Sequence, residues 1–163
     1  MLFRSRTITH SARWTAFLVF AACAAHAPAA AAQPRSPLDV WAPAAGSPER
    51  KGILNALRQR LQSTPTFKVA FVAVAGTHAF VRAGEVVRDG RAFQETDLFI
   101  EGLLVKNVEG GHTRWRVLEW WNLSAQPTGE EHRAFLSRVQ RVIRDKGLPQ
   151  TLLPVDLRTA PRP

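Results

Sequence analysis

The side chains with the clearest potential for metal or acid/base chemistry are three histidines. His78, His112 and His132 lie far apart in the sequence, with no His-x-x-x-His spacing and no cysteine partner. A zinc site needs imidazole, thiolate or carboxylate ligands that converge on one point. The sequence therefore predicts no metal site and no cofactor, and it places His132 at the edge of the core.

Three carboxylates, Asp97, Glu101 and Glu119, lie among apolar neighbours in segments with strand-like alternation. Burial makes a carboxyl group less acidic, and such a group can exchange a proton near neutral pH. These residues are the catalytic candidates if the protein is an enzyme. The simpler interpretation places each of them on the outer face of a strand or in an ion pair with Arg114 or Arg116.

The chain lacks the motifs of common nucleophilic and nucleotide-binding sites. No Gly-x-Ser-x-Gly, P-loop or Gly-x-Gly-x-x-Gly occurs, and tyrosine, a frequent donor in small enzyme pockets, is absent. The only cysteine, Cys23, lies in the amino-terminal apolar run. We therefore expect a non-catalytic protein, with a small-molecule enzyme or carrier as the alternative.

Tryptophan and arginine gather in one segment, as Arg114, Trp115, Arg116, Trp120 and Trp121. These two residue types suit binding interfaces, because indoles bury a large area and guanidinium groups stack on them. Adjacent strand residues point to opposite faces, so Trp120 and Trp121 cannot both enter one core without a bulge. Either one indole faces a partner, a pocket or the leader segment, or Trp41 and the tail cover the second face. The first alternative predicts a binding or inhibitory domain that uses these five residues.

The first 32 residues are typical of an export signal. Arginines but no acids precede a ten-residue apolar run at 16–25 (AFLVFAACAA), and small residues follow at 30–32. A membrane span needs about 20 apolar residues, whereas a signal core needs about 7 to 15. We expect cleavage before Gln33, which gives a periplasmic or secreted protein. Alternatively, Phe20-Ala-Ala-Cys23 resembles a lipobox, and the product is then a lipoprotein anchored at Cys23.

Export changes the meaning of the basic composition. The chain carries 22 Lys+Arg against 13 Asp+Glu, a net charge of +9, and loss of the three signal arginines lowers the net charge to +6. Nucleic acid is not the usual partner of an exported protein, so we do not expect nucleic-acid binding. A protein or a small hydrophobic ligand fits better, and membrane contact is expected only after lipidation at Cys23.

Two helices are predicted, one at each end of the exported chain. Ser47 followed by proline is a typical helix start, and apolar residues then recur with helical spacing up to residue 61. Gly52 inside this helix costs about 1 kcal/mol relative to alanine, which packing must offset. The second helix begins with a capping box at Thr128–Glu131 and ends at Gly147.

The stretch between these helices has no proline from 66 to 126 and alternates as strands do. Gly76-Thr77, Asp89-Gly90 and Gly110-Gly111 supply the residues of tight turns, and these three turns divide the stretch into about four antiparallel strands. Helices outside a hairpin sheet must cover one of its faces. The predicted fold class is therefore α+β, with an N-terminal helix, about four antiparallel strands and a C-terminal helix packed on one face of the sheet.

Proline placement completes the predicted domain organisation. Prolines at 34, 37 and 43 disfavour regular structure ahead of the first helix, where Val40 and Trp41 are expected to dock on the domain as an apolar anchor. The predicted segments are a signal peptide (1–32), a Pro/Ala-rich leader (33–46), a single α+β domain (47–155) and a flexible tail (156–163).

A resemblance adds to these predictions. Residues 38–58 (LDVWAPAAGSPERKGILNALR), followed by Gly110-Gly111 and Arg114–Val117, resemble uncharacterised exported bacterial proteins with such an opening and hairpin. The element order is similar to that of NTF2-like and cystatin-like domains. The resemblance implies export and one compact domain, it carries over no catalytic residue, and fold alone does not decide function.

Overall fold

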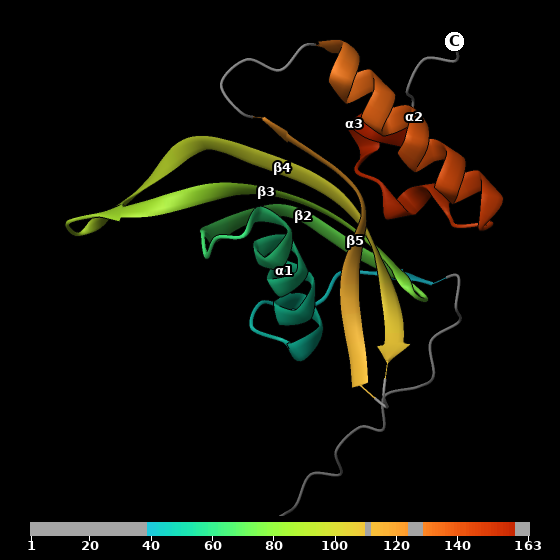
Figure 1. The fold of residues 1–163 in the computed structure, drawn as a ribbon, viewed down its shortest axis with the longest axis horizontal. Helices are drawn as coiled ribbons and strands as arrows, with labels where there is room; N and C mark the ends of the chain where they lie inside the picture. The colour runs from blue at the N-terminus through green and yellow to red at the C-terminus, as the bar shows by residue number, and fades with distance from the viewer. Residues whose placement is uncertain (1–38, 110–111, 124–128, 159–163) are drawn as a thin grey trace, which may run out of the picture. The chain divides into compact units, whose positions relative to one another are not determined.

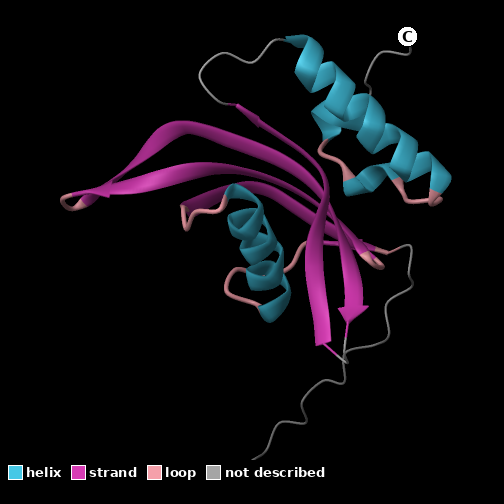
Figure 2. Ribbon diagram, in the orientation of Figure 1, coloured by secondary structure: helices cyan, strands magenta, loops and turns pink. Residues whose placement is uncertain are grey.

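The computed structural model describes residues 39–109, 112–123 and 129–158. This part of the chain forms a five-stranded antiparallel sheet with helices on both faces (Figures 1 and 2), which confirms the α+β class. In chain order the elements are β1 (Val40–Trp41), α1 (Pro48–Leu61), β2 (Thr66–Ala75), β3 (His78–Asp89), β4 (Ala92–Glu109), β5 (His112–Leu123), α2 (Gly129–Asp145), the 3-10 helix η1 (Gln150–Leu152) and α3 (Val155–Arg158).

The fifth strand, β1, corrects the predicted count of four. The strand order is β1-β2-β3-β4-β5, and Val40 and Trp41 pair with Ala75 and Val74 of β2. The leader was expected to be irregular, but two of its residues reach the edge of β2 and complete a ladder there. The side chain of Trp41 packs against the core under α1, as an apolar anchor would.

Helix α1 begins where local sequence chemistry predicts. The Ser47 side chain accepts a hydrogen bond from the Arg50 backbone N–H at 3.2 Å, and proline occupies the first turn. The helix ends at Gln62, which takes a left-handed conformation with φ 53°. Ile53 and Leu57 are buried against the sheet, so one stripe of α1 faces inward.

Each face of the sheet has its own core. Helix α1 covers one face, and α2, η1 and α3 cover the other (Figure 1). The buried members of the α1-side core are Ile53, Ala56, Leu57, Val72, Val74, Ala79, Val81, Ala83, Ile100, Leu104 and Trp115. Those of the α2-side core are Ala73, Ala75, Phe80, Leu103, Phe135, Val139, Ile143, Leu152, Leu153 and Leu157.

A bulge in β5 decides which tryptophans share a face. Leu103 pairs with Glu119, whereas the next residue of β4 pairs with Val117, so Leu118 is an extra residue in the ladder. The extra residue reverses the alternation of side chains. As a result Trp115 and Trp120, which differ in parity, both pack on the α1 side.

The carboxyl-terminal boundary lies later than predicted. The tail was expected to begin at residue 156, but α3 continues to Arg158, and Leu157 is buried in the α2-side core. The aspartate of this helix, Asp156, is ion-paired to Arg82 of β3. Burial of Leu157 and this ion pair explain why the segment is part of the fold. The predicted signal peptide and the Thr128 cap lie outside the described residues.

Candidate functional site

The three predicted carboxylates have different surroundings. Asp97 is exposed on β4, and Glu119 of β5 pairs with Arg138 of α2 at 2.7 Å between Oε2 and Nε. Glu101 is only 1% exposed. The structure therefore does not gather the three into one site, and their partners differ from the predicted Arg114 and Arg116.

The buried Glu101 belongs to a charged network on the α2 side of the sheet. Arg82 donates from Nε to Oε1 of Glu101 at 2.7 Å, and His132 of α2 donates from Nε2 to Oε2 at 2.8 Å. A second guanidinium nitrogen of Arg82 donates to Oδ2 of Asp156 at 2.7 Å. The network connects β3, β4, α2 and α3, and it satisfies both oxygens of the buried carboxylate.

Two pKa shifts follow from these contacts. Burial alone would lower the pKa of Arg82, but its hydrogen bond to Asp156 and its pairing with Glu101 outweigh burial and raise it. The hydrogen bond from Arg82 is also the main cause that lowers the pKa of the Asp156 carboxyl. Both side-chain oxygens of Glu101 are hydrogen-bonded, which offsets the cost of burying this polar group. The arrangement fastens two helices to the sheet, and the acid/base role of Glu101 stays a prediction.

Trp120 and Trp121 point to opposite faces, as strand alternation predicts, and helices cover both faces. Trp120 packs on the α1 side, where the guanidinium carbon of Arg60 lies 4.8 Å from its ring centroid. Trp121 packs on the α2 side, with its ring centroid 4.3 Å from that of His132. Both indoles are half-buried, and their role in binding stays a prediction. Helix α1 covers the face of Trp120, where Trp41 also packs, and α2, η1 and α3 cover the face of Trp121, where Leu157 is the buried residue from the predicted tail.

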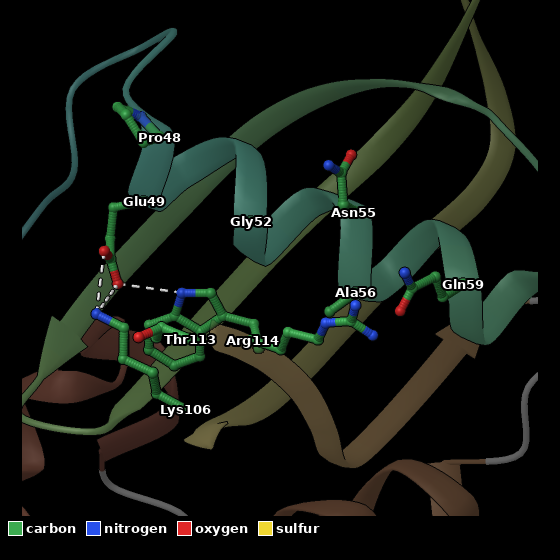
Figure 3. A pocket seen from close by; sticks show the side chains of 10 residues that line it. Pro48, Glu49, Gly52, Asn55, Ala56, Gln59, Lys106, Thr113 and Arg114 are labelled. Atoms are coloured by element: carbon green, nitrogen blue, oxygen red, sulfur yellow. Dashed lines mark hydrogen bonds and ion pairs between the residues drawn. The ribbon is translucent and has the colours of Figure 1, made fainter. Parts of the chain in front are cut away.

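A groove lies between α1 and the start of β5 (Figure 3), and we call it the α1–β5 groove. It contains two of the predicted binding residues, Arg114 and Trp115, together with a side of α1 and one residue of β4. The lining residues are Pro48, Glu49, Gly52, Asn55, Ala56, Gln59, Lys106, Thr113, Arg114 and Trp115.

One end of the groove is fixed by a charged contact (Figure 3). The indole Nε1 of Trp115 donates to Oε1 of Glu49 at 3.0 Å, and Lys106 Nζ lies 2.8 Å from the same oxygen. Lys106 also donates to Oε2 at 3.1 Å. Because Trp115 is only 8% exposed, these bonds hold the first turn of α1 against β4 and β5, and Lys106 neutralises Glu49.

Glycine at position 52 makes this close approach of α1 to β5 feasible. A Cβ atom on Gly52 would lie 2.9 Å from Cδ1 of Trp115, closer than real Cβ contacts. Ala56 lies four residues after Gly52 on the same side of α1, so two small residues line the groove from this helix. The sequence predicts only the cost of Gly52, and the structure shows that Trp115 occupies the space a side chain would need.

The rest of the groove presents hydrogen-bond donors that are not engaged. Within the described part of the chain, the side chains of Thr113, Arg114 and Gln59 have no hydrogen-bond or ion-pair partner. Asn55 uses its Oδ1 to accept from Arg58 at 2.8 Å. Figure 3 shows the Arg114 side chain extending toward the side of α1 that carries Gln59. The groove can therefore donate hydrogen bonds and attract negative charge.

Sequence reasoning found Arg114 and Trp115 but missed the α1 side of the groove. Glu49, Gly52, Ala56 and Gln59 recur with helical spacing on one side of α1, and the small residues among them were the available signal. The remaining predicted binding residue, Arg116, is exposed on β5 and is not among the residues that line the groove.

No three His, Cys, Asp or Glu side chains among the described residues are grouped to hold a metal ion, and no helix there is long and apolar enough to cross a membrane. Comparison of the chain with protein-family models, curated proteins and solved structures finds no match. The resemblances to exported bacterial proteins and to NTF2-like and cystatin-like domains therefore stay predictions.

Proposed function

We propose that this chain is an exported, non-catalytic binding domain and that the α1–β5 groove is its binding site. The observation that carries the proposal is the contrast inside the groove. Trp115, Glu49 and Lys106 form a fixed end, while Arg114, Thr113 and Gln59 have donors without partners beside it. A rigid wall next to convergent free polar groups is the usual form of a binding site.

The chemistry of the groove favours binding over catalysis. None of Asp97, Glu101 and Glu119 lines it. Both oxygens of its carboxylate, Glu49, already accept a hydrogen bond, from Trp115 at Oε1 and from Lys106 at Oε2. A general base needs a lone pair within reach of the proton that it removes. The free groups are donors and a guanidinium, which bind and orient a ligand.

Export is the second part of the proposal, and it rests on residues 1–32. The test is to express the full chain in a bacterial host, isolate the periplasmic product and determine its amino-terminal sequence. We expect the product to begin at Gln33 and to be unaffected by Cys23→Ala. A lipid-modified product whose formation depends on Cys23 would replace this proposal with membrane anchoring.

Binding in the groove is tested by filling it. Gln59→Trp places an indole in the groove, whereas Lys51→Trp places the same side chain on an exposed part of α1 that does not line it. The chain from Gln33 and both variants are immobilised and exposed to periplasmic extract in moderate salt. We expect the wild type and Lys51→Trp to retain the same molecule and Gln59→Trp to lose it. Retention by all three proteins, or by none, would contradict binding in the groove.

A further inference from the structure

The α1–β5 groove lies at an edge of the sheet. In the strand order β5 is terminal, and among the described residues it pairs only with β4. The outer edge of a terminal strand presents backbone N–H and C=O groups that can pair with another extended chain. The groove therefore combines free side-chain donors with a strand edge.

One backbone hydrogen bond shows which backbone groups of β5 face outward. The N–H of Lys106 donates to the carbonyl oxygen of Thr77 at 2.7 Å, so the backbone polar groups of Lys106 face β3. Lys106 is opposite Trp115 in the β4–β5 ladder. Because its backbone groups face β3, Lys106 and Trp115 form a non-hydrogen-bonded pair of that ladder. The N–H and C=O of Trp115 consequently point to the outer edge, and alternation gives Thr113 the same orientation.

We infer that the α1–β5 groove takes an extended peptide segment of acidic character, which adds as a strand beside β5. The inference rests on the proposed function and names the partner class for that site. The outward groups of Thr113 and Trp115 are two residues apart, which is the spacing at which an extended chain presents its own N–H and C=O groups. A peptide in this position would lie along the outer edge of β5, with α1 beside it, where Asn55 and Gln59 offer amides.

Charge specifies the acidic partner. Arg114 in the groove and Arg116 next to it on β5 are exposed, and neither has an ion-pair partner within the described residues. The acid in the groove, Glu49, is neutralised by Lys106. A guanidinium group binds carboxylates in a bidentate geometry, so Asp or Glu side chains of a partner fit these two arginines.

The structure also argues against a sugar as the occupant and limits the length of pairing. The Trp115 ring is buried at 8% exposure and its N–H is engaged by Glu49, so it does not present a stacking platform. The bulge at Leu118 interrupts the regular edge of β5, because an extra residue breaks the alternation of outward groups. Strand addition is therefore confined to residues 112–117.

The test selects ligands from displayed ten-residue peptides of random sequence, with the chain from Gln33 as the target. Selected peptides are then made with a fluorescent label, and their affinity is measured by anisotropy. We expect selected sequences to be enriched in Asp and Glu. We expect Thr113→Pro, which removes an outward N–H, to weaken binding about tenfold or more, and Thr113→Val, which keeps it, to change binding less than about threefold.

Two further comparisons separate backbone pairing from loss of fold. Arg114→Glu should weaken the acidic peptides about tenfold and Lys51→Trp should not. N-methylation of alternate peptide residues should abolish binding to the unaltered protein, which needs no folding control. If Thr113→Pro binds the peptides with unchanged affinity and the unaltered protein binds the N-methylated peptides equally well, strand addition is overturned. Weaker peptide binding by Gln59→Trp would still support the groove as the binding site. Enrichment of basic peptides, or no selected peptide, would overturn the acidic-peptide inference, and the extract experiment would judge the proposed function separately.

Discussion

Replacing Gly52 by alanine tests how α1 packs on β5, because two effects of opposite sign meet at this residue. Helix propensity alone predicts a gain of about 1 kcal/mol, since alanine is the better helix former. The structure predicts a loss, because the new Cβ would lie 2.9 Å from Cδ1 of Trp115. That indole cannot move away freely, since it is 8% exposed and hydrogen-bonded to Glu49.

The expected size follows from these two contributions. Overpacking of a well-filled contact costs about 1–3 kcal/mol, and subtraction of the propensity gain leaves a net loss of about 1 kcal/mol. Urea denaturation of the chain from Gln33, followed by far-ultraviolet circular dichroism, measures this difference as a lower midpoint at unchanged slope. Gly52→Ala should also lower peptide affinity, because the displaced Trp115 lies in the groove.

A second background separates the two effects. In a Trp115→Leu protein the obstructing ring is gone, so Gly52→Ala should now stabilise by about 0.5–1 kcal/mol. The sign of the substitution therefore depends on the residue at 115. Stabilisation by Gly52→Ala in the presence of Trp115 would refute the close packing of α1 on β5.

Further substitutions probe the two cores, the network around Glu101 and the titration of His78. Trp120→Ala and Trp121→Ala should each cost about 2–4 kcal/mol, because helices cover both sheet faces, and a near-neutral result for either in urea denaturation would reveal an open face. Glu101→Gln should cost about 2–3 kcal/mol, because the new amide NH2 meets a donor of Arg82 or His132 where a carboxylate oxygen accepted, while Arg82 keeps its ion pair with Asp156. Glu119→Gln should cost less than about 1 kcal/mol, because its ion pair is more exposed, and equal losses would contradict the buried network. Burial, and then a nearby lysine, lowers the pKa of His78, so the unfolded chain binds that proton at a higher pH than the folded chain. The free energy of unfolding should therefore fall as pH drops through about 6.5, and it should fall less steeply in a His78→Asn protein. If the wild type and His78→Asn lose the same free energy of unfolding between about pH 7.5 and 5.5, His78 is not the residue responsible.

Features that depend on neighbouring residues were predictable from the sequence. The start of α1 follows from the Ser47 side chain and the proline after it, both of which act within one turn. The opposite orientation of Trp120 and Trp121 follows from the two-residue period of a strand. The β3–β4 turn was predicted at Asp89-Gly90; Asp89 pairs with Ala92, so the loop lies one residue later, at Gly90-Arg91, with Gly90 at a positive φ of 58°.

Features that depend on pairing between distant segments were not predictable. The bulge at Leu118 is set by the register of β5 on β4, and it decides that Trp115 and Trp120 share a face. The partner of Glu101 is Arg82, 19 residues away, and no local pattern relates them. β1 was missed because a two-residue strand has no sequence period and exists only where the edge of β2 receives it.

Half of the candidate site was therefore visible in the sequence and half was not. Arg114 and Trp115 were found because their residue types are typical of interfaces. Asn55 and Gln59 were not found, because exposed amides on a helix carry no functional signal until a strand edge is placed beside them. The groove forms where the side of α1 that carries Gly52 and Ala56 packs on β5. Neither segment alone would reveal it, because it depends on how the two pack together.

The position of η1 and α3 has a consequence for synthesis of the protein. Leu152, Leu153 and Leu157 belong to the α2-side core, yet the ribosome adds them only after all five strands have been made. A nascent chain cannot complete that core until translation has passed residue 157, so it stays incompletely folded while it is being made. Proteolytic shortening to Pro149 would uncover apolar sheet residues and expose the product to aggregation or degradation. The stability of the domain therefore depends on an intact segment from η1 to α3.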